Sequence, residues 1–271
     1  QAPISRLPSP FPLFAGMILM RPLAVLTLAG LCAMPTAAAP ATAQTASPAA
    51  TQRADIETLQ RLYNERFVAT PFAGLYQIDR PIPYSPRETA PILVTRDGEY
   101  SFNNGKLGAQ HGDTGAPLSG SEWGALVLRW RDQIRYSDLI QQGGNGPLRM
   151  LLLSAYDCPF SKKLEAALAA AGTRYAIIPS TIGTANKPFL PDIWCSPDRA
   201  ATWRRAIGTG ALPPRASRSC RYDRRYFETL SGMFGGSKPT ALFADGTIVA
   251  SPSPAFVKQK LATLSRQGIA F

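Results

Sequence analysis

Four consecutive residues, Cys158-Pro159-Phe160-Ser161, carry the clearest chemical signal in this chain of 271 residues. A cysteine thiolate is the nucleophile in thiol–disulfide exchange. Pro159 suits the first position of a helix, where a backbone N–H is not needed. We therefore predict that Cys158 lies at a helix N-terminus, where the helix dipole stabilises a thiolate. An inert cysteine is the alternative interpretation.

The cysteine and histidine content limits the other chemistry open to the chain. Four cysteines and a single histidine are too few for a zinc cluster with paired ligands at short spacings, so we expect neither a metal nor a cofactor. Apart from Cys32, which lies in an apolar run near the start, the cysteines are Cys158, Cys195 and Cys220. An odd number leaves one thiol free or paired with another chain.

The first 43 residues are expected to lie outside the fold. Residues 1–16 precede the methionines at positions 17 and 20, and we interpret them as upstream residues. Arg21, an apolar run over 23–34 and the small residues Ala41-Thr42-Ala43 then form the pattern of a secretory signal peptide. We predict that it is cleaved near Ala43.

Two other interpretations of this leader are weaker. A spanning helix needs about 20 apolar residues, more than this run supplies, so we expect no stable membrane insertion. A lipoprotein site at Cys32 would require a small residue just before it, where the chain has Leu31. We therefore predict a periplasmic protein, whose thiols lie in an oxidising compartment.

Short strands and helices surround the candidate nucleophile. The apolar run Met150 to Ser154 predicts a buried strand just before Cys158, and the helix that begins at Pro159 is expected to end at Gly172. A further apolar run predicts a strand over 175–178, and two more predict a hairpin with strands over 240–243 and 248–249. A last helix is predicted over 253–264. This βαβ plus ββα order is the thioredoxin pattern, interrupted by a helical insert at about 187–236.

The first half predicts a smaller α+β unit. Apolar residues at helical spacing predict a helix from Asp55 to Phe67, preceded by a flexible lead-in over 44–52. Residues 103–119 contain the only histidine, His111, and are predicted to form a loop in which that side chain is solvated. A helix capped by Ser121 would link the two halves. Strands are predicted over 75–78, 92–95 and 100–102.

These patterns together predict an α+β protein in four parts. They are the upstream residues and signal peptide over 1–43, a small N-terminal domain over 44–118, a linker helix over 119–147, and a thioredoxin-like domain with its insert over 148–271.

Positive charge is concentrated in the insert. The chain has a formal charge of +11, and residues 187–238 contain ten basic and four acidic side chains. A solvated face explains such a cluster, and a docking surface for an acidic partner or an anionic lipid is the alternative. We expect no nucleic-acid partner, because base-stacking aromatics are not interleaved with the basic residues.

Three segments resemble the C-terminal domain of the periplasmic disulfide isomerases of the DsbC/DsbG type. They are LLLSAYDCPFSKKLEAALA, DIWCSPDRAATWRRAIGTGALPPRASRSC and SKPTALFADGTIV. The middle segment is the most specific, because ordinary thioredoxins lack the insert and its cysteine pair. The segments ATPFAGLYQID and ILVTRDGEYSFNNGKL resemble the N-terminal dimerisation domain of that family more weakly. The resemblance implies a thioredoxin fold and a V-shaped homodimer whose catalytic domains face a cleft.

The resemblance also implies roles for three further residues, and it draws attention to a fourth. It implies a structural disulfide between Cys195 and Cys220, and a cis bond before Pro239 in a loop that packs against Cys158. The family usually has a small polar residue before this proline, where the present chain has Lys238. An ammonium near the cysteine would favour the thiolate and help to dock acidic substrate segments. A lysine that extends into solvent is the alternative.

The chain departs from the family at its active site. The family pattern is Cys-x-x-Cys, and Ser161 stands at the position of the second cysteine. A second thiol resolves the mixed disulfide formed by the first, which a hydroxyl cannot do, so net dithiol oxidation or reduction is not expected.

We therefore predict an exported thiol–disulfide exchange or isomerase-like protein with one nucleophile, Cys158. Its substrates would be disulfide-bearing exported proteins, and a partner thiol would complete the cycle. The alternative is a non-catalytic chaperone or assembly factor of a secretion or conjugation system.

Overall fold

The computed structural model describes residues 47–271, except for 83–84, 104–107 and 218. The predicted signal peptide and its cleavage site near Ala43 lie outside the described residues. The described chain belongs to one compact unit. None of the described helices is long and apolar enough to cross a membrane.

Five strands form the sheet that carries the predicted nucleophile, in the spatial order β10-β9-β7-β8-β6. Their bounds are Ile140–Gln142 (β6), Met150–Ala155 (β7), Tyr175–Ser180 (β8), Thr240–Phe243 (β9) and Ile248–Ala250 (β10). The central strand β7 runs parallel to β8 and antiparallel to β9. The two edge strands pair antiparallel with their neighbours.

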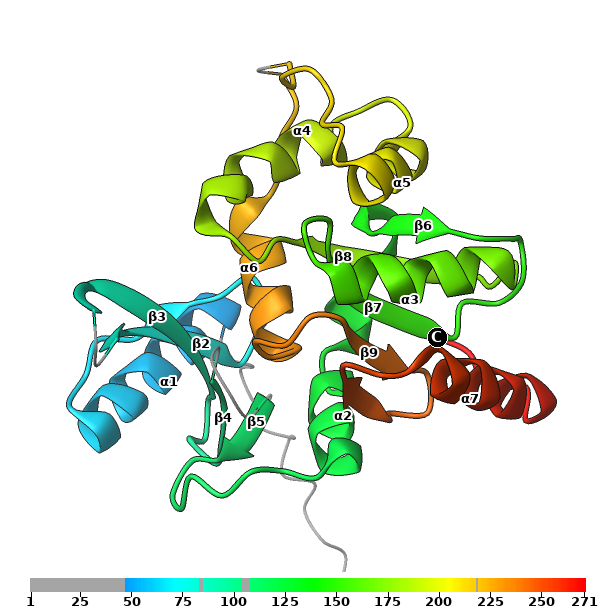
Figure 1. Cartoon of the computed structure of the whole chain (residues 1–271). Coiled ribbons are helices and arrows are strands. Elements are labelled where there is room, and N and C mark those ends of the chain that lie inside the picture. Colours follow the sequence, from blue (N-terminus) through cyan, green and yellow to red (C-terminus); the bar gives the residue numbers. More distant parts are fainter. Residues whose placement is uncertain (1–46, 83–84, 104–107, 218) are drawn as a thin grey trace, which may run out of the picture. The chain divides into compact units, whose positions relative to one another are not determined.

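Helices cover both faces of this sheet, which explains why β7 is apolar along most of its length. Met150 and Leu152 pack in one core with α3 (Pro159–Ala170) and α7 (Pro254–Arg266). Leu151 and Leu153 belong to the core on the other face, with α2 (Gly120–Leu128) and α6 (Arg224–Met233). Figure 1 shows α3 and α7 side by side. This arrangement is a thioredoxin fold, as the βαβ plus ββα pattern predicts.

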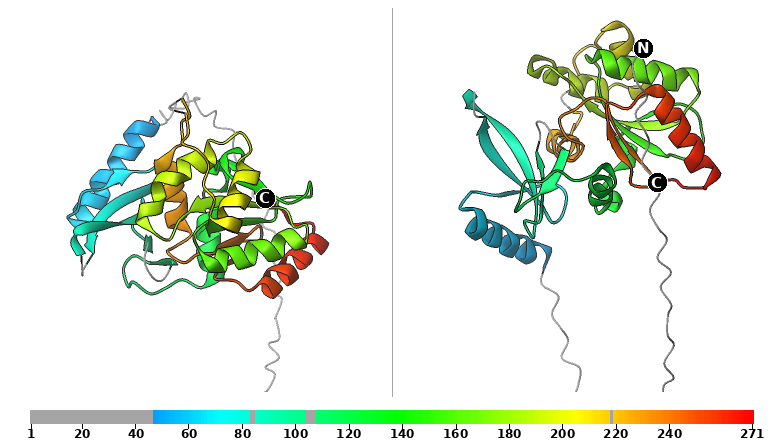
Figure 2. Two further views of the ribbon diagram at one scale, coloured as in Figure 1. Left: turned by 45° about the horizontal axis from the view of Figure 1, so that its top comes forward. Right: turned by 60° about the horizontal axis from the view of Figure 1, so that its bottom comes forward.

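The first sheet is an antiparallel meander in sequence order. Its strands are Val68–Ala69 (β1), Leu75–Ile82 (β2), Ser85–Thr95 (β3), Tyr100–Asn103 (β4) and Gly108–His111 (β5). Helix α1 (Pro48–Tyr63) packs on one face, where Leu59 meets Tyr76 in a small core. The α1 helix lies along this sheet in both views of Figure 2. Leu75 and Leu93, from the other face, join the core that α2 and α6 share with the second sheet.

Two features of the first half differ from the predictions. α1 begins at Pro48 rather than at Asp55, because the side chain of Ser47 caps the helix and the proline follows at its first turn. Residues 108–111, within the predicted loop, form β5 because they pair with β4. His111 is therefore a half-buried strand residue rather than a loop residue.

The α2 helix is shorter than the linker helix predicted over 119–147. It ends at Leu128, and two 3-10 turns, Arg131–Gln133 (η1) and Tyr136–Asp138 (η2), lead into β6. The end of the predicted helix is a strand because it pairs with β8. The helix is capped by Ser119 rather than Ser121, in a reciprocal capping box with Glu122.

Helix α2 connects the two sheets. A Cβ atom on Gly124 would lie 1.7 Å from the Gly246 carbonyl oxygen, so only glycine fits where the helix meets the β9–β10 turn. The Trp123 indole N–H donates to the Met233 carbonyl of α6 at 2.9 Å. One hydrophobic core therefore continues from the first sheet into the second. The domain boundaries expected at 118 and 147 stay predictions.

The insert is helical, as predicted. It contains η3 (Thr184–Phe189), α4 (Leu190–Trp194) and α5 (Arg199–Thr209) ahead of α6. Cys195, at the end of α4, is bonded to Cys220, and the two cysteines are 25 residues apart in the sequence. The predicted structural disulfide is confirmed.

Candidate active site

The backbone around Cys158 forms the predicted helix start. Cys158 is the N-cap of α3, with φ −100° and ψ 120°, and Pro159 takes the first helical position. The Cys158 carbonyl accepts the first helical hydrogen bond, from the Lys162 N–H at 3.0 Å. The Cys158 N–H donates to the Ala155 carbonyl, also at 3.0 Å, which fixes the turn between β7 and the helix.

The Cys158 thiol is hydrogen-bonded to the loop before β9. Its Sγ donates to the carbonyl oxygen of Lys238 at 3.4 Å, and it makes no capping hydrogen bond to α3. The residue is only 3% exposed, and it is the one free cysteine among the described residues. The helix therefore starts where the sequence predicts, and the sulfur contacts the carbonyl of the facing loop rather than the amides of α3.

The loop predicted to face the cysteine does so. The Lys238–Pro239 bond is cis, as the family resemblance implies, and Pro239 is buried. The Thr240 hydroxyl donates to the Ser237 carbonyl at 2.8 Å, and the Pro239 carbonyl accepts from the Ser251 N–H at 2.7 Å. These bonds hold the loop on which the Cys158 thiol rests.

Ser161 is fully buried, and its hydroxyl has a structural partner. The Ser161 Oγ accepts a hydrogen bond from the Ala155 N–H at 3.3 Å. That N–H belongs to the last residue of β7, so the hydroxyl ties the first turn of α3 to the strand before it. A hydroxyl cannot form a disulfide with Cys158, and here it is occupied by the backbone.

Lys238 contacts the sulfur through its backbone rather than through its ammonium. The half-buried side chain directs Nζ to the Gly236 carbonyl at 3.3 Å. Burial and the nearby Lys187 ammonium lower the pKa of Lys238, whereas Asp157 and Cys158 oppose that change. Lys187, in η3, is thus a second cation near the site, and sequence reasoning did not single it out.

Asp157, directly before the cysteine, organises the rim of the site. Its carboxylate accepts hydrogen bonds from the Ile182 N–H at 2.7 Å, the Gly183 N–H at 3.2 Å and the Asn186 side-chain amide at 2.7 Å. The loop after β8 is therefore anchored to the residue beside Cys158. The only sequence signal for this role is the position of an aspartate between a strand and a helix.

Glu165 is a buried carboxyl of α3 in the core beside the second sheet. It accepts hydrogen bonds from Ser154 at 2.5 Å, from Tyr175 at 3.3 Å and from the Trp203 indole at 3.0 Å. Burial raises the pKa of Glu165 to about 7, and the hydrogen bonds oppose the rise. Sequence spacing contains a signal for it, because Glu165 falls on the buried stripe of α3 beside Leu164.

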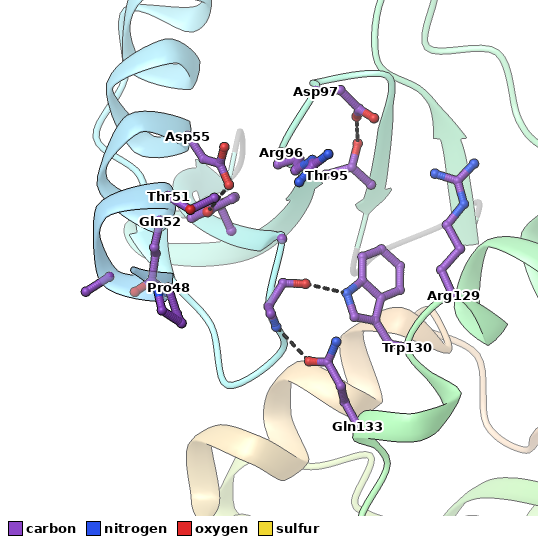
Figure 3. A pocket seen from close by; sticks show the side chains of 14 residues that line it. Pro48, Thr51, Gln52, Asp55, Thr95, Arg96, Asp97, Arg129, Trp130 and Gln133 are labelled. Atoms are coloured by element: carbon purple, nitrogen blue, oxygen red, sulfur yellow. Dashed lines mark hydrogen bonds between the residues drawn. The ribbon is translucent and has the colours of Figure 1, made fainter. Parts of the chain in front are cut away.

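A cavity of about 660 Å³ opens elsewhere in the chain. It is lined by α1, by the first sheet and by the segment after α2, and none of the predicted site residues lines it. Figure 3 shows the polar contacts at its wall, where the Trp130 indole donates to the Ala73 carbonyl and Gln133 accepts from the Ala73 N–H. Cys158 is therefore outside this cavity, and we place the candidate active site at this cysteine.

Comparison with family models and with curated proteins finds no match. Among solved structures, the chain is similar to a disulfide interchange protein from Neisseria gonorrhoeae, with 25% identity over 48% of this chain and 97% of that one and a TM-score of 0.42. It is similar to the thiol-disulfide exchange protein alpha-DsbA2 from Wolbachia pipientis, with 12% identity over 54% and 97% of the two chains and a TM-score of 0.38. A third is DsbG from Helicobacter pylori, with 12% identity over 71% and 100% and a TM-score of 0.33.

Proposed function

We propose that the protein carries out thiol–disulfide exchange through Cys158 alone. The observation that carries this proposal is the position of a free thiol at the N-terminus of α3, in contact with the loop that contains the cis Lys238–Pro239 bond. The other two described cysteines are bonded to each other, so they do not compete for this chemistry.

The reaction needs no cofactor. The Cys158 thiol loses its proton to solvent, and its sulfur attacks one sulfur of a substrate disulfide. A bond forms between Cys158 and that sulfur, the substrate S–S bond breaks, and the other substrate sulfur leaves as a thiolate. A second thiolate, from the same substrate or from a partner, then attacks the mixed disulfide and releases Cys158. The result is an isomerised or exchanged disulfide with no net oxidation.

Net dithiol chemistry is not part of the proposal, because the position of a resolving thiol is occupied by Ser161. Its hydroxyl accepts a hydrogen bond from β7 inside the core. Every mixed disulfide must therefore be resolved by a thiol from another molecule or from the substrate.

We further propose the setting in which this chemistry takes place. The protein would be exported to the periplasm after cleavage near Ala43, and would act as a homodimer on exported proteins with incorrect disulfides. The signal-peptide pattern in the sequence and the family resemblance support this setting.

One observation favours a second candidate function, that of a chaperone or assembly factor without redox chemistry. The Cys158 side chain is 3% exposed, whereas Phe160, two residues later, is 71% exposed. The exposed Phe160 side chain at the start of α3 could contact an unfolded segment without any reaction at the sulfur.

Covalent trapping distinguishes the two functions. The purified protein is incubated with a protein that has one exposed disulfide, and the products are separated without reductant. Exchange through Cys158 predicts a mixed disulfide that is absent from Cys158→Ala and lost on addition of a small thiol. A chaperone predicts no covalent product and equal suppression of aggregation by the wild type and Cys158→Ala.

A further inference from the structure

Two exposed apolar side chains flank the candidate nucleophile. Phe160 is 71% exposed and Ile182 is 59% exposed, and both are among the few large hydrophobic residues that the described chain leaves in solvent. Phe160 lies in the first turn of α3, two residues after Cys158. The backbone N–H of Ile182 is bonded to Asp157, the residue before the cysteine. Each side of Cys158 is thus linked to an exposed apolar side chain, Phe160 through the sequence and Ile182 through its hydrogen bond to Asp157.

Two cations lie at the same rim. Lys238 supplies the carbonyl that contacts the Cys158 sulfur. Lys187 follows Asn186, whose amide is bonded to the Asp157 carboxylate at 2.7 Å. Burial and the positive charge of Lys187 both lower the pKa of Lys238. None of the ion pairs formed by the described residues involves either lysine.

The acidic group at this rim is already occupied. The Asp157 carboxylate accepts three hydrogen bonds from the loop after β8, and both of its oxygens are used. It offsets part of the positive charge, but this rim has two lysines and one aspartate. A partner that approaches the sulfur therefore meets a net positive rim beside an apolar one.

We propose that the partner of Cys158 is a peptide segment in which the reacting cysteine is flanked by apolar and acidic residues. Its apolar side chains would contact Phe160 and Ile182, and its carboxylates would pair with Lys187 and Lys238. This inference rests on the proposed exchange at Cys158, and it specifies which substrate disulfides react fastest with that cysteine. Charge attraction raises the association rate more than it raises the affinity.

Three synthetic peptide disulfides of equal length test this proposal. In the first the cysteine is flanked by leucine and aspartate, in the second by leucine and lysine, and in the third by serine and aspartate. The formation rate of the mixed disulfide with Cys158 is followed by intact mass. The wild type is expected to react fastest with the first peptide, and the ratio of the first to the second rate should fall at high salt.

Variants of the rim identify the groups responsible. Lys187→Gln and Lys238→Gln should each reduce the rate with the first peptide by about fivefold, the effect of one charge pair about 4 Å apart in water, and so lower the ratio of the first to the second rate. Lys187→Glu should invert the preference, which a folding defect would not do. Phe160→Ser, at an exposed position, should reduce the ratio of the first to the third rate. Lys258→Gln, which removes an exposed cation from α7, is the matched control and should change neither ratio.

The outcomes separate this inference from the function on which it rests. Equal ratios in the wild type and in the lysine variants, with rapid reaction at Cys158, would overturn the inference and leave the exchange function intact. A preference for acidic peptides that lacks any dependence on leucine would overturn the apolar part. No adduct with any of the three peptides would overturn both.

Discussion

The thiol of Cys158 and the backbone carbonyl of Lys238 form a hydrogen bond of 3.4 Å between residues 80 apart in the sequence. It joins the start of α3 to the loop before β9. The cysteine is also buried, since Cys158 is 3% exposed. The proposed nucleophile is therefore held in place as a donor, and attack on a disulfide begins with the loss of this contact.

Removal of the thiol should weaken the fold only slightly. Cys158→Ala deletes one hydrogen bond to a carbonyl, so the free energy of unfolding is expected to fall by about 1 kcal/mol. Urea unfolding measures this change. A loss of several kcal/mol would show that the contact is a main structural bond, and Cys158→Ser would then be the better control for trapping.

A second thiol should restore dithiol chemistry. Ser161→Cys places a cysteine at the position of the resolving residue, and its activity in insulin reduction should exceed that of the wild type by about tenfold or more. The control is Ser161→Ala, which also lacks the hydroxyl that accepts from the Ala155 N–H but gains no thiol. Loss of that hydrogen bond should lower the free energy of unfolding by about 1 kcal/mol. An accessible thiol pair in Ser161→Cys without activity would contradict the proposed exchange site.

The disulfide of the insert should contribute to stability and not to the reaction. Cys195→Ser together with Cys220→Ser opens a loop of 25 residues, and the free energy of unfolding should fall by about 3 kcal/mol through the entropy of the unfolded chain. The mixed-disulfide yield at Cys158 should stay unchanged under conditions in which the variant is folded. A loss of reactivity in the folded variant would assign this bond a part in the chemistry.

Glu165 should make the stability depend on pH. Its pKa is raised by burial from 4.5 to about 7, so the unfolded chain releases this proton at a lower pH than the folded chain does. The free energy of unfolding should therefore fall as the pH rises from about 4.5 to about 7, by about 3 kcal/mol in total from this group, and stay level above that range.

Urea unfolding across this pH range checks the effect. The difference in stability between the wild type and Glu165→Gln should change with pH as described, because the variant has no carboxyl to titrate. Ser154→Ala, which keeps the carboxyl, should retain the slope. If the difference in stability between the wild type and Glu165→Gln is the same at every pH, burial does not raise the pKa of Glu165.

The half of the chain that contains Cys158 could be predicted from the sequence because its signals are local. The apolar run at Met150, the proline after Cys158 and the serine before Pro254 mark the strand and the two helix starts, and the structure has all three. The short edge strands β5 and β6 were not predicted, since they have four and three residues and exist through pairing with their neighbours.

The candidate site was predictable only in part, for a related reason. Cys158, Pro239 and Lys238 follow from a motif and a resemblance, and the structure brings them together. Asp157 and Lys187 join the site through a loop whose path depends on tertiary contacts, since Asp157 accepts from Asn186, the residue before Lys187. Neither residue type at its position indicates that arrangement.

Isomerisation of a protein with scrambled disulfides tests the central claim most directly. The recovery of native activity is followed in a glutathione buffer with wild-type protein and with Cys158→Ser. We predict that the wild type accelerates recovery and that Cys158→Ser does not, because the serine cannot form the mixed disulfide. Equal acceleration by the two proteins would contradict the claim that Cys158 carries the function.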